Sequence, residues 1–295
     1  MVTKHSDPRA LVLVLGAVVS VQFGGALAAT LVPKIGAAGS VTMRLLFSVT
    51  ILLIFLRPRV RGYTAAQWRT VGLFGLALGL MNFSFYASLA YLPIGVAVTI
   101  EFIGPLLLAT VLSRRPRDLF AVAAAAVGVV LISEITHVPL AEISWIGLGL
   151  ALTAGAFWAA YVVLSEKTGA IFPKLDGLAL ALVVSTAVVL PFGIPSMAQW
   201  DRSALLLGFG IALLSSVIPY SLELVALRRI APGVFGILLS LEPAVAALAG
   251  LIVLGQRLHT LQLVGMALVV AASVIVMGLG ARPTDRPDPA QTAAT

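Results

Sequence analysis

The chain has 295 residues, of which 60% are hydrophobic and 11% are charged, and its mean hydropathy is +1.08. Soluble domains contain about 45–50% apolar and about 25% charged residues, so this composition excludes a soluble protein and indicates an integral membrane protein. The net charge of +7 comes from basic residues in short gaps between apolar runs, which indicates membrane orientation and argues against nucleic acid as a partner. The chain has no cysteine, which excludes disulfides and thiol-based sites.

Ten apolar runs are long enough to span a bilayer, because a helix needs about 20 apolar residues to cross about 30 Å of hydrocarbon. The predicted spans are residues 10–31, 37–56, 70–91, 94–113, 118–135, 145–165, 177–194, 204–227, 232–254 and 261–280. The first run continues into Pro33 and Lys34 without a cleavage signal, so we expect a retained helix and no signal peptide. The Pro-rich tail 282–295 is predicted to be disordered.

The basic residues predict the orientation. With the N-terminus in the cytoplasm, 15 of the 19 Lys and Arg residues lie on the cytoplasmic side, Lys34, Arg202 and Arg257 lie outside, and Arg44 lies within a span. This bias predicts that both termini are cytoplasmic. Residues 1–140 and 141–281 then contain five helices each, an odd number, so the second half crosses the membrane in the opposite direction. We therefore predict an all-α membrane protein of ten helices in two inverted repeats.

One helical hairpin occurs twice in the chain. In residues 81–116, a Leu92-Pro93-Ile94-Gly95 turn joins two apolar helices, and residues 218–256 show a related pattern. In each hairpin a turn glycine precedes a proline within the helix by ten residues, at Gly95 and Pro105 and again at Gly233 and Pro243. Two copies of a hairpin with a polar centre are typical of transporters built from repeats.

Several polar side chains lie deep inside the predicted spans. At 1.5 Å per residue, Gln22, Asn82, Glu101, Trp158 and Glu242 fall near the middle of the membrane. Asn82 shares a helix face with Tyr86, and Tyr220 shares one with Glu223. Arg44 lies about one turn inside the outer end of its span. Ionisable residues inside a membrane mark functional sites by default, and Glu101 has no basic neighbour on its own helix.

Most of these residues also have a structural interpretation. Arg44 either lines a cavity or extends its side chain to the outer headgroups. Glu223 either acts in the site or pairs with Arg228 or Arg229 near the inner surface. Asn82 either binds substrate or bridges two helices. The aromatic residues Tyr86, Trp158 and Tyr220 either line a cavity or serve in packing.

The chemistry of these groups indicates a small zwitterionic cargo. Burial favours the uncharged form of a carboxyl group, so Glu101 and Glu242 are candidates for binding a proton or a substrate ammonium group. Arg44 is suited to bind a substrate carboxylate with two hydrogen bonds. The predicted substrate-binding residues are Glu101, Asn82, Tyr86, Arg44, Gln22, Trp158, Tyr220 and Glu242, of which Glu101 and Glu242 are the predicted proton-coupling residues.

The pattern of spans and two stretches of the chain resemble a known group of proteins. Its ten spans and paired glycine–proline helices resemble the EamA-type drug/metabolite transporter superfamily. Residues 81–106 (MNFSFYASLAYLPIGVAVTIEFIGPL) and 219–258 (PYSLELVALRRIAPGVFGILLSLEPAVAALAGLIVLGQRL) resemble the Rht-type threonine/homoserine exporters of the inner membrane. The resemblance runs from about Leu11 to Gly280. It implies export of threonine, homoserine and related amino acids, driven by proton exchange. The family has Gly-Glu before the last helix where this chain has Gly255-Gln256, which removes one ion pair with Arg257.

We therefore predict a secondary transporter that exports small amino acids by alternating access, with protons and the lipid bilayer as its other partners and with no cofactor or metal. An exporter of aromatic compounds or toxic metabolites is the alternative within the same superfamily. An intramembrane enzyme is disfavoured because His5, His137 and His259 all lie outside the spans. A passive channel needs repeated polar rings along a pore, which isolated carboxylates do not provide. The preferred amino acid and the oligomeric state are left open.

Overall fold

The computed structural model describes residues 8–92, 94–112, 116–133, 144–255 and 259–278, and every regular element in these residues is helical. The α-helices are α1 (Pro8–Leu56), α2 (Ala65–Ser88), α3 (Ile94–Leu112), α4 (Pro116–Ser133), α5 (Trp145–Ile171), α6 (Asp176–Gly193), α7 (Arg202–Ala212), α8 (Ile218–Leu227), α9 (Pro232–Leu238), α10 (Glu242–Leu254) and α11 (Thr260–Gly278). Short 3₁₀ segments cover Ile194–Gln199 and Leu239–Leu241, and a π-helical turn covers Leu213–Val217. The prediction of an all-helical membrane protein is confirmed.

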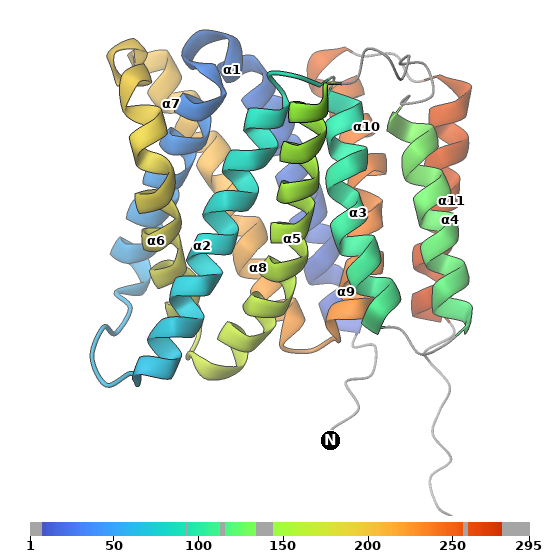
Figure 1. Cartoon of the computed structure of the whole chain (residues 1–295), viewed down its shortest axis with the longest axis horizontal. Helices are drawn as coiled ribbons and strands as arrows, with labels where there is room; N and C mark the ends of the chain where they lie inside the picture. Colours follow the sequence, from blue (N-terminus) through green and yellow to red (C-terminus); the bar gives the residue numbers. More distant parts are fainter. Residues whose placement is uncertain (1–7, 93, 113–115, 134–143, 256–258, 279–295) are drawn as a thin grey trace, which may run out of the picture.

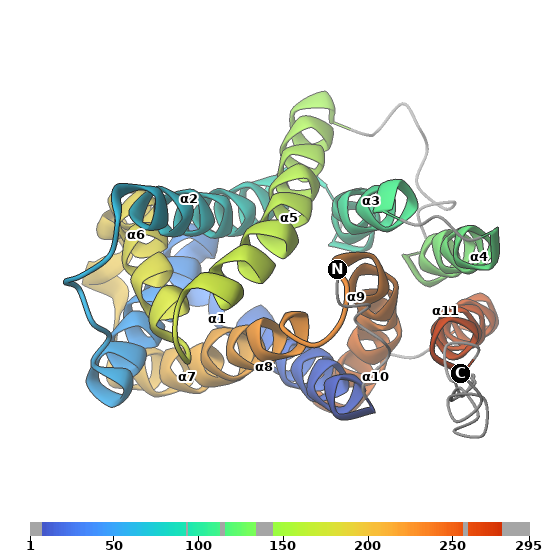
Figure 2. The same cartoon turned by 90° about the horizontal axis from the view of Figure 1, so that it is seen from below.

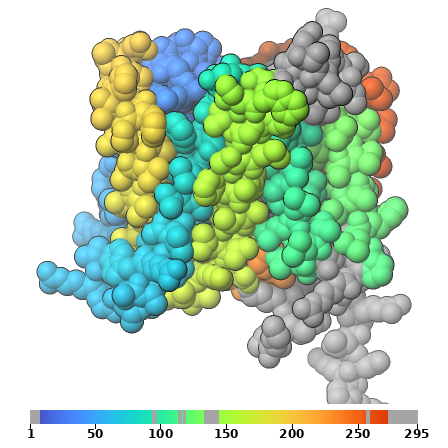
Figure 3. All heavy atoms as spheres, viewed as in Figure 1, coloured from blue at the N-terminus to red at the C-terminus, as the bar shows by residue number. Residues whose placement is uncertain are grey.

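Six helical stretches in the described residues are long and apolar enough to cross a membrane, and three shorter apolar helices accompany them. Large apolar side chains cover the outside of the bundle, for example Phe55 and Trp145, which are each 81% exposed. Such a surface is unsuitable for water and suitable for lipid. In the space-filling view, α6, α2, α5, α3 and α4 follow one another across one face of the molecule (Figure 3).

Helix α1 contains two of the predicted spans. Its helical hydrogen bonds continue past the predicted end at residue 31 and through Pro33, and the chain reverses direction at Gly36, which has a left-handed φ of 73°. Figure 1 shows the first limb of α1 rising from the N-terminal side and the second limb returning. Glycine adopts this conformation without the steric penalty of a Cβ atom, which allows the tight reversal.

Two predicted turns lie elsewhere in the structure. The turn after α2 is made by residues 89–92, whose N–H groups bond to the carbonyls of Ala87 and Ser88, so Ile94 and Gly95 already belong to α3. Pro93 lies outside the described residues. Similarly, α9 begins at Pro232, because proline has no N–H to satisfy at a first helical position, and Gly233 lies within the helix. Gly95 and Gly233 are therefore helical residues, and the prediction of turns there is wrong.

The helices form a bundle in which segments distant in sequence lie side by side. Helix α2 packs on α5 and α6, α3 packs on α5 and α9, and α4 packs on α11. Helix α1 contacts α6, α7, α8 and α10. Seen from below, α2 lies along one side of the bundle and α7 and α8 along the other, and α5 crosses from one side toward the other (Figure 2). Polar residues of α1, α2, α3, α5, α8 and α10 therefore have the opportunity to meet in the interior.

Contacts between loops and helix ends close the bundle on the side of the N-terminus. Asp176, at the start of α6, accepts hydrogen bonds from the Arg59 N–H (3.3 Å) and the Tyr63 hydroxyl (3.4 Å) in the linker after α1. The Tyr63 ring packs on Phe172 with the ring centroids 4.6 Å apart. Burial raises the pKa of Tyr63, and the neighbouring Asp176 raises it further. These contacts tie the first half of the chain to the α5–α6 connection.

Candidate functional site

A cavity of about 390 Å³ lies inside the bundle. It reaches the ends of α2 and α10 and the start of α11 at Leu89, Leu254 and Gln262, all on the side opposite the N-terminus. All eight predicted substrate-binding residues line it: Gln22, Arg44, Asn82, Tyr86, Glu101, Trp158, Tyr220 and Glu242. Six helices contribute these residues, so the tertiary structure brings the predicted polar residues together.

Arg44, on the second limb of α1, is 95% buried in the cavity wall. Its Nη2 atom donates a hydrogen bond to Asn82 Oδ1, and its guanidinium carbon lies 5.5 Å from the centre of the Tyr86 ring. Its Nε–H is buried without a hydrogen-bond partner. The alternative in which Arg44 extends to the outer headgroups is therefore wrong. A buried guanidinium with one unused donor is suited to bind an anion, because an unsatisfied buried donor costs about 1–3 kcal/mol.

Asn82 connects Arg44 to the second half of the chain. Its Nδ2 atom donates to the Leu78 carbonyl (2.8 Å) and to the Tyr220 hydroxyl (3.2 Å), while its Oδ1 atom accepts from Arg44. Asn82 thus bridges α2, α1 and α8, as the structural interpretation predicts, and it also lines the cavity. The result is a continuous network of Arg44, Asn82 and Tyr220 along one wall of the cavity.

Glu242 lines the cavity at the point where the predicted ninth span is interrupted. The 3₁₀ segment Leu239–Leu241 separates α9 from α10, and Glu242 and Pro243 begin α10. Gln22 Nε2 donates to Glu242 Oε2 at 3.3 Å. A helix N-terminus carries partial positive charge and favours a carboxylate, so the break in the helix gives Glu242 a suitable place inside the membrane.

Glu101 is 8% exposed and lies in the middle of α3. The α3 helix approaches α5 closely here, because a Cβ atom on Gly155 would come within 2.5 Å of the Glu101 carbonyl oxygen. Beside it, Phe102 and Trp158 form an edge-to-face pair with ring centroids 5.4 Å apart. Glu101 therefore faces the cavity from a wall of close helix packing and aromatic rings.

Tyr161 was not among the predicted site residues, and Glu223 was predicted either to act in the site or to pair with Arg228 or Arg229. Tyr161 Oη donates to Glu223 Oε2 at 2.5 Å, and both residues line the cavity. Arg228, a predicted partner of Glu223, instead directs its guanidinium group to the carbonyl oxygens of Gly169, Phe172 and Lys174. Burial lowers the pKa of Arg228. Tyr161 follows Trp158 by three residues, and this helical spacing would have indicated that both share a face.

A π-helical turn precedes α8 and contributes to the cavity wall. Residues 213–217 form this turn between α7 and α8, and Ser215 lines the cavity. The Ser20 hydroxyl donates to the Leu214 carbonyl at 2.7 Å, so a polar group at the turn is satisfied by α1. A π turn inside a helix frequently occurs at functional sites. The predicted span 204–227 is therefore correct in extent but not regular in its interior.

Taken together, the cavity combines one guanidinium group with three carboxylates in an interior that lipid surrounds. In the described residues no group of three or more His, Asp or Glu side chains is arranged to hold a metal ion. The arrangement suits a small molecule that carries both an anionic and a cationic group.

Comparison with known proteins agrees with this chemistry. Residues 145–278 match the EamA-like transporter family. The chain is 37% identical over 270 residues to the threonine/homoserine exporter RhtA of Escherichia coli (strain K12), with 90% of each chain covered. RhtA of Salmonella typhimurium (strain LT2) is also 37% identical, with the same coverage. The chain belongs to the EamA-like transporter family.

Membership of the EamA-like family makes this protein a transporter and not an enzyme, and places it in the inner membrane as a multi-pass protein. A crystal structure of a protein 18% identical in sequence has a TM-score of 0.74 and covers 93% of this chain and 98% of that chain. At this identity the similarity concerns the fold alone. Gln256, which differs from the glutamate of the family, and Arg257 lie outside the described residues.

Proposed function

We propose that this EamA-like transporter exports small zwitterionic amino acids, threonine and homoserine among them, in exchange for protons. The observation that supports this most directly is the unpartnered Nε–H of buried Arg44 in a cavity that also contains carboxylates. The names of the RhtA relatives, which cover 90% of the chain, support the same cargo.

The proposed binding mode places the two charged ends of the amino acid on opposite walls. The substrate carboxylate binds Arg44 through Nε–H and one Nη–H, and Asn82 and Tyr220 hold the guanidinium side of the site in place. The ammonium group binds Glu101 or Glu242. A cavity of about 390 Å³ is adequate for a cargo of this size.

Proton coupling follows from competition for the same carboxylates. Glu101 and Glu242 bind either a proton or the substrate ammonium group, because an isolated charge in a dry cavity is costly and must be neutralised. Protons that arrive from the outside therefore displace the amino acid outward. This mechanism needs a cavity that opens alternately to the two sides of the membrane.

We propose that alternating access occurs between two inverted repeats, residues 1–140 and 141–281, followed by a cytoplasmic tail at 282–295. Reciprocal contacts support this arrangement. A Cβ atom on Gly128 would meet the Gly265 carbonyl at 2.7 Å, and one on Gly265 would meet the Gly128 carbonyl at 2.6 Å, as a two-fold axis requires. Asn82 and Tyr220, which bond to each other, each lie 13 residues before Gly95 and Gly233, respectively.

Efflux from proteoliposomes tests the proposal. Wild-type protein and the Glu101→Gln variant are compared for labelled threonine and homoserine, with and without a pH gradient and in substrate–substrate exchange. We expect a pH gradient to drive wild-type efflux and Glu101→Gln to lose this response while exchange continues. Loss of both activities in a folded variant would place Glu101 in substrate binding only.

The control variant is Glu166→Gln, which changes a carboxylate of α5 that does not line the cavity and should keep full activity. Wild-type protein that moves neither amino acid would contradict the proposed cargo. A panel of aromatic and cationic compounds would then identify which class of molecule the transporter exports.

A further inference from the structure

A tyrosine–carboxylate pair lies at the inner end of the cavity and has no role in the binding mode above. Tyr161 of α5 donates a hydrogen bond to Glu223 of α8 at 2.5 Å. Tyr161 is 1% exposed and Glu223 is 5% exposed, so both side chains are buried in the interior of the bundle. Burying a carboxylate is costly, and a pair of apolar residues would bridge two helices at lower cost. The pair therefore requires an explanation beyond packing.

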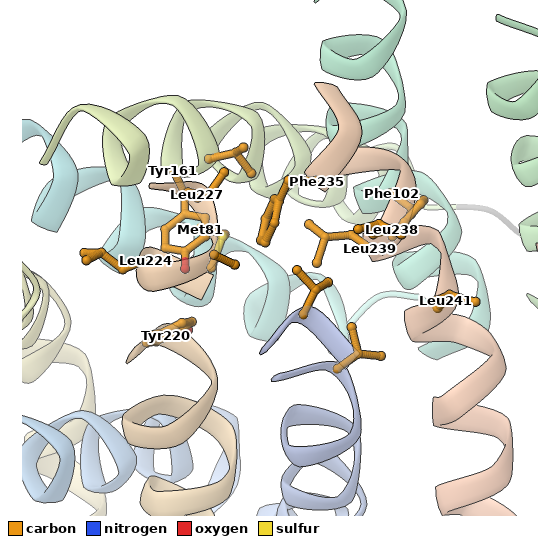
Figure 4. Packing of buried hydrophobic residues seen from close by; sticks show 14 of the residues in the cluster. Met81, Phe102, Tyr161, Tyr220, Leu224, Leu227, Phe235, Leu238, Leu239 and Leu241 are labelled. Atoms are coloured by element: carbon orange, nitrogen blue, oxygen red, sulfur yellow. The ribbon is translucent and has the colours of Figure 1, made fainter. Parts of the chain in front are cut away.

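Glu223 lies closer to the inner surface than the other cavity carboxylates. It precedes the end of α8 at Leu227 by four residues, or about 6 Å along the helix. Leu224, Leu227 and Phe235 are fully buried, and in Figure 4 the Phe235 ring lies between Tyr161 and the Leu238–Leu239 pair. Leu224 and Leu227 follow Glu223 along α8, so an apolar layer lies between Glu223 and the end of this helix on the side that contains the N-terminus.

Helix α8 links Glu223 to the proposed substrate site. Tyr220 precedes Glu223 by three residues and therefore shares its helix face, and the Tyr220 hydroxyl accepts a hydrogen bond from Asn82. The Tyr220 and Tyr161 rings are in contact, with centroids 5.7 Å apart. If Tyr220 shifts when substrate binds Arg44, α8 and the Tyr161 ring shift with it. The position of Glu223 changes as a result.

The charged and titratable groups around Glu223 come from six of the helices that line the cavity. They are Tyr161 of α5, Tyr220 of α8, Arg44 of α1, Tyr86 of α2, Glu101 of α3 and Glu242 of α10. One guanidinium group balances one carboxylate, and the remaining carboxylates need a bound cation or a proton. The cavity therefore contains more carboxylates than cationic groups, and a carboxylate without a cationic partner is available to bind a proton.

We propose that Glu223 exchanges protons with the cytoplasm and that Tyr161 is its positioning residue. This inference rests on the proposed function for the direction of transport. The proton binds a Glu223 oxygen from water in the cavity and leaves to water on the inner side when the apolar layer opens. Tyr161 keeps its own hydrogen throughout and orients the carboxylate.

Infrared difference spectra of the purified full-length protein test the proton site without any cargo. Spectra are recorded between acidic and alkaline pH for wild type, Glu223→Gln and Tyr161→Phe. We expect Glu223→Gln to lose one carboxylic acid C=O band and Tyr161→Phe to shift the frequency of that same band, because a hydrogen bond is removed. Tyr91→Phe, which removes an exposed hydroxyl outside the cavity, is the control and should leave this region unchanged.

Transport by the same variants in proteoliposomes gives the second readout. Glu223→Gln is expected to lower proton-driven threonine export by about tenfold or more, within the usual range of coupling between two sites, and to retain threonine–threonine exchange. The proposal would be overturned if the Glu223→Gln spectrum were identical to that of wild type, or if this variant lost stability without losing a band. The Tyr161–Glu223 pair would then serve only to connect α5 and α8. A missing band in a protein that moves neither amino acid would uphold the proton site and reject the proposed cargo.

Discussion

Arg44 is held by two side chains and still has a donor without a partner. Asn82 accepts from one Nη group, Tyr86 stacks near the guanidinium plane, and Nε–H faces no acceptor. A guanidinium group can keep the Asn82 contact and bind a carboxylate at the same time, because its five donors point in fixed directions. The ammonium group of a lysine at this position has a single nitrogen with which to contact both Asn82 and the substrate carboxylate.

We therefore predict that Arg44→Lys weakens substrate binding. Loss of the two-point contact, at about 1.5–3 kcal/mol for a hydrogen bond to a charged group, corresponds to an increase of about tenfold or more in KM. The KM for threonine in substrate–substrate exchange measures this. Arg202→Lys, at the exposed start of α7, is the matched control. An unchanged KM in Arg44→Lys would show that the substrate carboxylate binds elsewhere.

At the scale of helices, the contact between α3 and α5 depends on glycine. A Cβ atom on Gly155 would lie 2.5 Å from the Glu101 carbonyl, whereas one on Gly149 in the same helix would meet nothing within 4 Å. Gly155→Ala must push α3 and α5 apart, which typically costs about 1–3 kcal/mol. Gly149→Ala should be neutral or stabilising because alanine favours the helix.

Thermal unfolding of the two purified variants compares these glycines. We expect a lower Tm for Gly155→Ala and an unchanged or higher Tm for Gly149→Ala. Because the shift at Gly155 also displaces the backbone of Glu101, transport should fall in the same variant. Equal Tm values for both variants would mean that the two helices do not approach as closely as the structure shows.

The N-terminus of α7 provides a pH-dependent contribution to stability. Asp201 accepts hydrogen bonds from the Ala204 N–H (2.7 Å) and the Ser203 hydroxyl (2.8 Å). The Ala204 bond contributes most to lowering the pKa of Asp201 below its ordinary value of 3.8. A carboxyl with a lowered folded-state pKa stabilises the fold at higher pH, and this contribution is lost as the pH falls through 3.8 and below.

The Asp201→Asn variant isolates this effect. Asparagine caps a helix about as well as aspartate but does not titrate, so the Tm difference between wild type and variant should shrink as the pH is lowered from 6 to about 3. Scanning fluorimetry across this range measures the difference. A difference that stays constant with pH would show that the charge of Asp201 contributes nothing to the cap.

At the scale of the whole molecule, the cavity reaches helix ends on the side opposite the N-terminus, at Leu89, Leu254 and Gln262. With cytoplasmic termini, this is the outer side, so we expect the cavity to be accessible from outside. The chain contains no cysteine, so single cysteines can be introduced without preparing a cysteine-free background. Exposed positions are available on both sides, at Ala90 after α2 and at Arg61 before it.

We predict that a membrane-impermeant maleimide labels Ala90→Cys in intact cells and labels Arg61→Cys only after the membrane is permeabilised. Ala29→Cys, which lines the cavity, should react from outside and be protected by threonine. Gel-shift labelling measures all three. The reverse pattern at Ala90 and Arg61 would contradict the proposed orientation and make the observed cavity inward-facing.

Composition and hydropathy were sufficient to predict a membrane protein and its helical class, and the family was identified from its resemblance in residues 81–106 and 219–258. These features are local, because each span must be apolar over its own length to cross the hydrocarbon. The depth of Glu101 and Glu242 along their helices follows from the same count of residues. The reversal at Gly36 falls in the predicted gap between the spans 10–31 and 37–56, whereas the π turn at residues 213–217 and the 3₁₀ segment before Glu242 lie inside predicted spans and were not predicted.

The sequence by itself determined which residues are polar inside the membrane, and the tertiary structure decided which of them meet. Arg44 was ambiguous in the sequence because its direction depends on how α1 packs against α2. Glu223 and Tyr161 form a pair only because α5 and α8 place them face to face, 62 positions apart in the chain. Helix rotation and packing are set by many long-range contacts, which a one-dimensional pattern of hydropathy does not contain.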